Sequence, residues 1–154
     1  MRNLAFAVAI VALLINIALE HVLLGMRPAE GVLIPGLLDL QYAWNNGVSF
    51  SLFRQDSAAG RQTLFAVLLV VSGIVAFFAW RARTKFSAVG FGLILGGALG
   101  GLLDRQLYGA VLDFLALHIG STPLFVCNLS DIWISAGVLA LIADEFGPMR
   151  GNRS

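Results

Sequence analysis

The segment from residue 62 to residue 80 reads QTLFAVLLVVSGIVAFFAW, which is 19 residues without a charged side chain. An α-helix needs about 20 apolar residues to cross the hydrocarbon core of a bilayer, so this segment is expected to span a membrane. Arg61 and Arg81 stand at its two ends, where charged side chains can reach the aqueous boundary. How often this pattern recurs along the chain decides the fold class.

Charged residues delimit three further segments of the same kind. Residues 3–19 and 86–103 carry no charge, and residues 125–144 carry none apart from Asp131 and the terminal Asp144. We therefore predict a single integral membrane domain over residues 1–154, with spans at about 4–24, 62–80, 86–104 and 125–145. No small-residue cleavage site closes the first segment, so we expect an uncleaved helix there rather than a signal peptide.

The composition agrees with a membrane protein. Of the 154 residues, 58% are hydrophobic and 12% are charged, and the net charge is +1. A soluble domain of this size could not bury so much apolar surface, and no basic patch suggests a nucleic-acid partner. The single cysteine, Cys127, excludes an internal disulfide. His21 and His118 lack a convergent carboxylate pattern, so we do not expect them to bind a metal.

Basic residues gather in three places that would share one side of the membrane. They are Arg2 at the start, the cluster Arg81, Arg83 and Lys85, and Arg150 and Arg153 in the tail. The positive-inside rule makes this side cytoplasmic, with both termini on it. The two connections on the other side are then the non-cytoplasmic ones.

The first non-cytoplasmic connection is expected to contain a small β-structure at about residues 31–60. Asn46-Gly47 separates the partly alternating run 40–44 from the cleanly alternating run 48–52. Asn-Gly between two such runs is a strong hairpin signal, because both central positions of the turn need positive φ. We expect the apolar side of this hairpin to face the membrane or the helices.

Glycines recur at helical spacing in the third predicted span. Gly92, Gly96 and Gly100 repeat every four residues, and Gly97 pairs with Gly101 in the same way. This spacing leaves bare backbone on a helix face and favours close contact between helices. Packing is the interpretation we prefer for these residues.

Among the carboxylates toward the non-cytoplasmic side, three stand out: Asp104, Asp113 and Asp131. Ionisable groups in membrane segments are costly and are candidates for function. Asp113 and Asp131 flank an uncharged connection that starts and ends on one face of the membrane, so they can meet. Two carboxylates sharing a site of low polarity hold one proton between them, which suits acid–base activation of water. A proton relay or a purely structural role is equally compatible with this spacing.

Four motifs occur in an order that resembles the bacterial lipoprotein signal peptidase family, signal peptidase II. They are NNGVSFSL at 45–52, GGALGGLLDR at 96–105, GAVLDF at 109–114 and NLSD at 128–131. The number of spans and the cytoplasmic termini are similar as well. The resemblance covers most of the chain.

The resemblance implies an intramembrane aspartic endopeptidase without metal or cofactor, in the cytoplasmic (inner) membrane of a bacterium. Asp113 and Asp131 would be the catalytic pair, acting toward the outer face of the membrane. Five residues would line or support the site: Asn45, Gly47, Asp104, Arg105 and Asn128. The implied partners are diacylglyceryl-modified prolipoprotein substrates and membrane lipids, and we expect a monomer. The fold class is thus an all-α membrane protein of four transmembrane helices, with a β-cradle outside and a short lid-like helix within 107–123.

Several positions depart from the family pattern. Asn16 and Glu20 stand where Asp and Lys are usual, Gly101 replaces an Asn, Val-Ser at 48–49 replaces Ala-Ala, and Cys127 replaces a Phe. The two aspartates are retained, but the residues around them differ. We interpret Cys127 as a small apolar filler rather than a nucleophile.

These departures keep two other functions open. One is a catalytically weakened or inactive paralogue that binds lipopeptides or a membrane partner. The other is a proton- or ion-handling bundle that uses Asp131, which the lack of internal repeats disfavours. Glu20 either pairs with an arginine such as Arg27 or faces the cavity, and the sequence does not choose between these.

Overall fold

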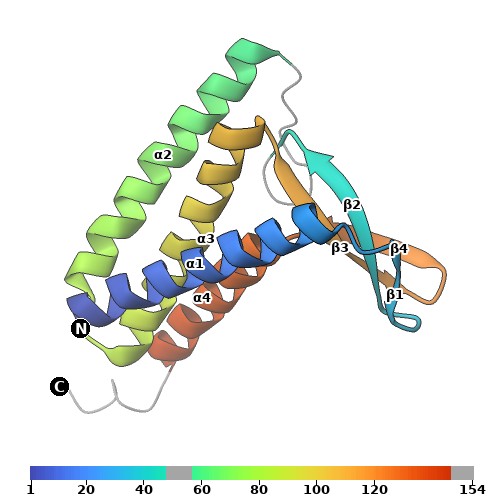
Figure 1. The fold of residues 1–154 in the computed structure, drawn as a ribbon. Coiled ribbons are helices and arrows are strands. Elements are labelled where there is room, and N and C mark those ends of the chain that lie inside the picture. Colours follow the sequence, from blue (N-terminus) through green and yellow to red (C-terminus); the bar gives the residue numbers. More distant parts are fainter. Residues whose placement is uncertain (48–56, 147–154) are drawn as a thin grey trace.

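The computed structural model of the chain describes residues 1–47 and 57–146 (Figure 1). In chain order the elements are α1 (Arg2–Met26), β1 (Gly31–Ile34), β2 (Leu38–Asn45), α2 (Ala58–Arg81), α3 (Lys85–Tyr108), β3 (Val111–Ile119), β4 (Thr122–Cys127) and α4 (Leu129–Phe146). The N-terminus, the α2–α3 connection and the end of α4 lie at one end of the helices, and the sheet projects from the other (Figure 1). The protein is therefore mostly helical with one small antiparallel sheet.

Local capping explains where two of the long helices begin and end. At the start of α2, the Ser57 side chain accepts a hydrogen bond from the Gly60 amide at 3.0 Å. At the start of α3, Thr84 and Ser87 form a reciprocal capping box. Gly109, at φ 78°, ends α3 in the left-handed conformation that glycine adopts without strain. These caps satisfy backbone groups that the helices leave unpaired.

Three helices of the described chain are long and apolar enough to cross a membrane. They are α1, α2 and α3, with mean hydropathies of 2.3, 2.4 and 1.9 over their most apolar stretches. The predictions at 4–24, 62–80 and 86–104 fall within them. Helix α3 continues to Tyr108, so Asp104 and Arg105 lie inside the helix rather than at its end.

The predicted fourth span at 125–145 starts too early. Phe125 and Cys127 belong to β4, where they pair with Leu117 and Leu115 of β3. Helix α4 begins only at Leu129 and has 18 residues. The strand extends this far because its backbone groups form hydrogen bonds with β3. A helix starting at residue 125 would leave those backbone groups of β3 unpaired.

The sheet has four antiparallel strands in the order β1-β2-β3-β4. The predicted short helix within 107–123 is wrong, because these residues form most of the β3–β4 hairpin, which turns at Gly120 with φ 58°. An apolar run such as 110–117 is compatible with either a helix or a strand, and pairing with β2 decides for the strand. The expected strand at 40–44 lies in β2, whereas its expected partner at 48–52 falls outside the described residues. The β-rich segment also ends earlier than predicted, since α2 begins at Ala58.

Helix α3 lies among α1, α2 and α4 and contacts all three. Its glycines allow this close approach, as predicted. A Cβ at Gly96 would lie 2.7 Å from both Ala12 Cβ and Ala9 O of α1, and a Cβ at Gly97 would lie 2.6 Å from Ser130 O of α4. Only glycine fits at such distances, so α3 packs backbone to backbone on two of its faces.

Candidate active site

Asp113 lies in β3 and is 2% exposed, and amide side chains contact both of its carboxylate oxygens. Asn45 Nδ2, at the end of β2, donates to Asp113 Oδ2 at 2.8 Å. Asn128 Nδ2, just before α4, donates to Asp113 Oδ1 at 2.6 Å. The pairing of β2 with β3 sets Asn45 opposite Val111, two residues from Asp113 on the same face of the strand. The sheet thus holds this carboxylate in a fixed orientation.

Asp131 lies in the first turn of α4 and is 8% exposed. The Asp131 amide donates to Asn128 Oδ1 at 3.1 Å, and the Asn128 amide donates to Asp131 Oδ2 at 3.3 Å. This reciprocal arrangement is a capping box, with Asn128 at the cap and Asp131 three residues on. The local sequence Asn-Leu-Ser-Asp therefore both starts the helix and orients its carboxylate.

Asn128 contacts both aspartates. Its amide nitrogen binds Asp113, while its amide oxygen and its backbone N–H bind Asp131. The charge of Asp131 also acts on Asp113. The structure thus brings together the two carboxyl groups that the spacing in the sequence singled out.

The pKa of Asp113 is raised to about 6. Removal of the carboxylate from water is the main cause, and the negative charge of Asp131 adds to it. The hydrogen bonds from Asn128 and Asn45 and the positive charge of Arg105 act in the opposite direction. A carboxyl group with this pKa exchanges its proton near neutral pH, as acid–base catalysis requires.

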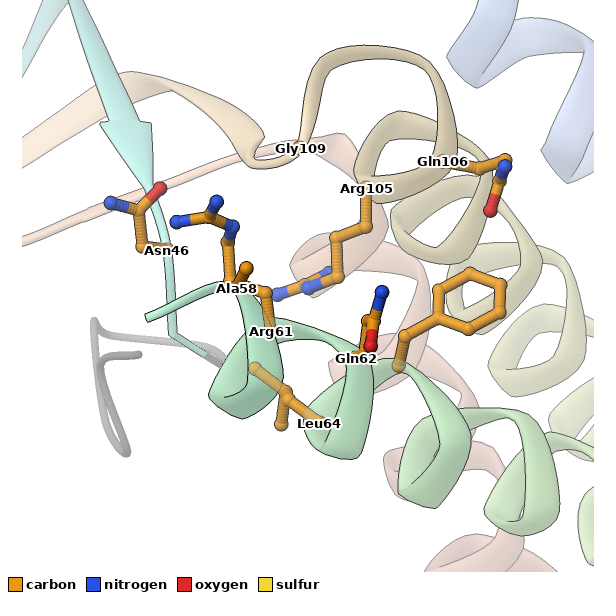
Figure 2. A pocket seen from close by; sticks show the side chains of 9 residues that line it. Asn46, Ala58, Arg61, Gln62, Leu64, Arg105, Gln106 and Gly109 are labelled. Atoms are coloured by element: carbon orange, nitrogen blue, oxygen red, sulfur yellow. The ribbon is translucent and has the colours of Figure 1, made fainter. Parts of the chain in front are cut away.

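Arg105 connects α3 to the segment after β2. Its Nη1 donates to Gly101 O at 2.9 Å and its Nη2 donates to Gly47 O. Gly47 N in turn donates to Asn45 Oδ1 at 2.8 Å, which leads back to Asp113. Figure 2 shows the Arg105 side chain reaching from α3 toward the first turn of α2, where Arg61 and Gln62 lie. Arg105, Gly47 and Asn45 thus form one connected hydrogen-bonded support.

A cavity of about 190 Å³ lies among α2, α3 and α4 and reaches Asp131. Its lining includes the polar side chains of Asn45, Arg105, Asn128 and Asp131, together with apolar side chains such as Leu68. A second cavity, of about 320 Å³, adjoins it at Arg105 (Figure 2). On the other side of Asp131, an apolar groove of about 470 Å³ runs between the sheet and α4. Asp131 thus borders both the cavity and the groove.

Asp104 lies apart from the Asp113–Asp131 pair. A side-chain hydrogen bond joins its carboxyl group to that of Glu20 on α1, and both residues are buried. The partner that the structure gives Glu20 is thus a second carboxyl group, that of Asp104.

Cys127 is buried at the end of β4. Removal from water, followed by the nearby charges of Asp131 and Asp113, raises the pKa of its thiol to about 11. Such a thiol is a poor nucleophile, in agreement with its interpretation as a filler. Within residues 1–47 and 57–146, no group of three or more His, Cys, Asp or Glu side chains could hold a metal ion.

Comparison with known proteins shows the family. Residues 4–147 match the model of the signal peptidase (SPase) II family, and the chain belongs to this family. It is 46% identical over 108 residues to the lipoprotein signal peptidase of Beijerinckia indica, and 38% identical over 152 residues to that of Rhodopseudomonas palustris. These alignments cover 70% and 93% of this chain, and 65% and 92% of the two relatives. The chain thus matches slightly less than two thirds of the first relative's length.

The fold is similar to that of a solved bacterial membrane enzyme. The TM-score is 0.80 at 20% identity, and the match covers 97% of this chain and 91% of the other. At this level of identity the likeness concerns the fold alone. A second bacterial membrane enzyme structure matches with a TM-score of 0.77.

Proposed function

We propose that the protein is an aspartic endopeptidase that removes signal peptides from lipid-modified prolipoproteins, with Asp113 and Asp131 as its catalytic residues. The observation that carries this proposal is the bridge formed by Asn128. Its side-chain nitrogen donates to the carboxyl group of Asp113, and its side-chain oxygen accepts from the backbone amide of Asp131. Membership of the signal peptidase II family supports the reaction and the substrate class. The proposal needs neither a metal nor a cofactor.

The two carboxyl groups would share one proton and hold a water molecule between them. The ionised group takes a proton from the water as its oxygen attacks the scissile carbonyl carbon, and the protonated group donates to the carbonyl oxygen. Transfer of a proton to the leaving nitrogen then breaks the C–N bond and yields a carboxylic acid and a free amine. The raised pKa of Asp113 supports a shared proton at neutral pH.

Four residues would support this chemistry from around the pair. Asn45 and Asn128 would orient Asp113, while Arg105 and Gly47 would hold Asn45 in place. Asp104 would act further away, through its contact with Glu20. The apolar cavity walls favour a lipid-modified, apolar substrate over a soluble peptide.

The proposal includes the topology of a single integral domain in the bacterial inner membrane. Helix α4 would be the fourth span, both termini would be cytoplasmic, and the site would face the outer side. The basic residues of the α2–α3 connection support this orientation. The protein would act as a monomer, together with substrate and membrane lipids.

The test is cleavage of a diacylglyceryl-modified prolipoprotein by purified protein, followed by gel shift, beside the variants Asp113→Asn and Asp131→Asn. We expect each variant to lose at least about 100-fold in rate while it remains folded. Asparagine at 113 offers only one oxygen to two amide donors, so thermal unfolding is measured in parallel to confirm folding. Full activity in either folded variant would refute the catalytic pair.

A binding protein without catalytic activity is the second candidate, favoured by the contact of Glu20 with Asp104 where the family usually has a lysine. Folded wild-type protein that binds the lipidated precursor and never cleaves it would establish this candidate instead. Turnover of the precursor by purified protein excludes it.

A further inference from the structure

A buried hydrogen bond joins α1 directly to α4. Asn16 Nδ2 donates to Ser130 Oγ at 2.9 Å, and the two residues are 7% and 4% exposed. The residues of α1 that are buried before Asn16 are alanines, so the bond lies at the end of an otherwise apolar contact surface. A hydrogen bond in such surroundings is costly to break, because both groups would lose their partner away from water.

Helix α3 leaves room for this bond only at a glycine. A Cβ at Gly100 would overlap Asn16 Nδ2 and lie 2.9 Å from Ser130 Oγ. Helices α1 and α4 otherwise pack mainly on α3 rather than on each other. The path from Asn16 to Ser130 therefore passes over bare backbone of α3.

Ser130 lies in the turn that carries the proposed site. It stands between Asn128 and Asp131, the two members of the capping box. Its carbonyl oxygen also lies against Gly97, where a Cβ would come within 2.6 Å. This turn is thus held on one side by the close contact with α3 and on another by Asn16.

We infer that Asn16 is a positioning residue that acts through Ser130 and holds the first turn of α4, and with it Asp131 and Asn128, in register with Asp113. The inference rests on the proposed function. Asn16 is a position at which this chain departs from the family pattern, and the inference gives this departure a role: the Asn16 amide donates a hydrogen bond to Ser130. A shift of about 1 Å in a reacting group can cost about 100-fold in rate, so loss of this contact is expected to affect catalysis.

The test is a double-mutant cycle of Asn16→Ala, Ser130→Ala and the double variant, with kcat and KM measured on the lipidated precursor. We expect kcat to fall about 10- to 100-fold in each variant with little change in KM, and the double variant to be no worse than the single ones. Asn16→Asp is the conservative variant, because the Ser130 hydroxyl can donate to a carboxylate, and it should retain most of kcat. If Asn16→Ala does not fold, Ser130→Ala removes the same bond and carries the same expectation.

Asp144→Ala is the matched control at the opposite end of α4. It removes the 2.8 Å hydrogen bond from Thr84 Oγ1 to Asp144 Oδ2, another contact between helices. We expect a lower melting temperature and an unchanged kcat. A folded Asn16→Ala or Ser130→Ala protein with normal kcat, or additive losses in the cycle, would overturn the inference. Wild-type protein that does not cleave the precursor would instead overturn the proposed function, before any variant is compared.

Discussion

Asn128 shows how one side chain can serve the fold and the proposed chemistry together. It starts α4 by accepting from the Asp131 amide, and its nitrogen is left to bind Asp113. The amide cannot be turned around without losing both hydrogen bonds. The orientation of the two carboxyl groups is therefore coupled to the start of α4. The local sequence specifies part of this arrangement, because it contains the residues of the capping box.

The first prediction concerns the pKa of Asp113. The hydrogen bond from Asn45 stabilises the ionised carboxylate, so Asn45→Ala should raise the pKa of Asp113 above about 6. The limb of the rate profile that reports this group should move to higher pH, whichever aspartate holds the proton at rest. The measurement is kcat/KM against pH, with Gln41→Ala, an exposed position on the same strand, as control. An unmoved limb would argue against Asp113 as a titrating member of the pair.

The second prediction concerns Cys127. Because burial raises the pKa of its thiol to about 11, very little thiolate exists at neutral pH. Alkylation by N-ethylmaleimide in the folded protein should be at least about 100-fold slower than that of an exposed cysteine. Ser121→Cys, in the exposed β3–β4 turn, supplies that reference in the same chain. Equal labelling rates at the two positions would show that Cys127 is accessible.

Among the secondary-structure elements, α3 is the helix on which α1 and α4 pack most closely, because glycines lie on the faces of α3 that these helices approach. Gly92 and Gly96 meet the small residues of α1, while Gly90 and Gly97 meet α4. The same helix then carries Arg105 toward the segment after β2. The four-residue spacing of Gly92, Gly96 and Gly100 predicted the close packing but not which helices would provide the partners.

The third prediction compares two glycines in neighbouring helices. Gly96→Ala would bring a methyl group to 2.7 Å from Ala12 Cβ and should destabilise the protein by about 1–3 kcal/mol. Gly73→Ala in α2 meets nothing within 4 Å and should be neutral or stabilising by about 0.5–1 kcal/mol. Thermal unfolding in detergent distinguishes them. A similar melting temperature for both variants would contradict the tight α1–α3 contact.

The boundary between β4 and α4 illustrates where sequence reasoning fails at this scale. Residues 122–146 are mostly apolar on both sides of Asn128, and apolar runs of this kind do not reveal where a strand ends and a helix begins. The pairing of Phe125 with Leu117 settles the strand, and Asn128 starts the helix. A capping-box search on residues 128–131 would have located this start.

At the scale of the whole molecule, the sheet lies at one end of the helices and the basic α2–α3 connection at the other (Figure 1). Arg2 lies 4.2 Å from the ring of Trp80, so the start of α1 and the end of α2 meet at the basic end. The proposed site lies where the helices meet the sheet. In the proposed topology, this position would place the cleavage site of a membrane-held substrate near the outer aqueous boundary.

The fourth prediction tests the orientation of this arrangement. Ser121→Cys should react with a membrane-impermeant maleimide in intact cells, since the β3–β4 turn is expected outside the cytoplasmic membrane. Ser154→Cys should react only after the cells are broken. The native Cys127, which is buried, gives the background. The opposite labelling pattern would reverse the proposed topology.

Three long apolar helices, the close packing along α3 and the family could be predicted from the amino-acid sequence, because these depend on local composition, on spacing within one helix and on short motifs. It also singled out Asp113 and Asp131 as a pair. Three features became visible only in the packed molecule: residues 111–127 form a hairpin, Glu20 contacts Asp104, and Asn16 binds Ser130, 114 positions away in the chain. These contacts join distant segments, and their partners exist only once the helices and the sheet have packed together.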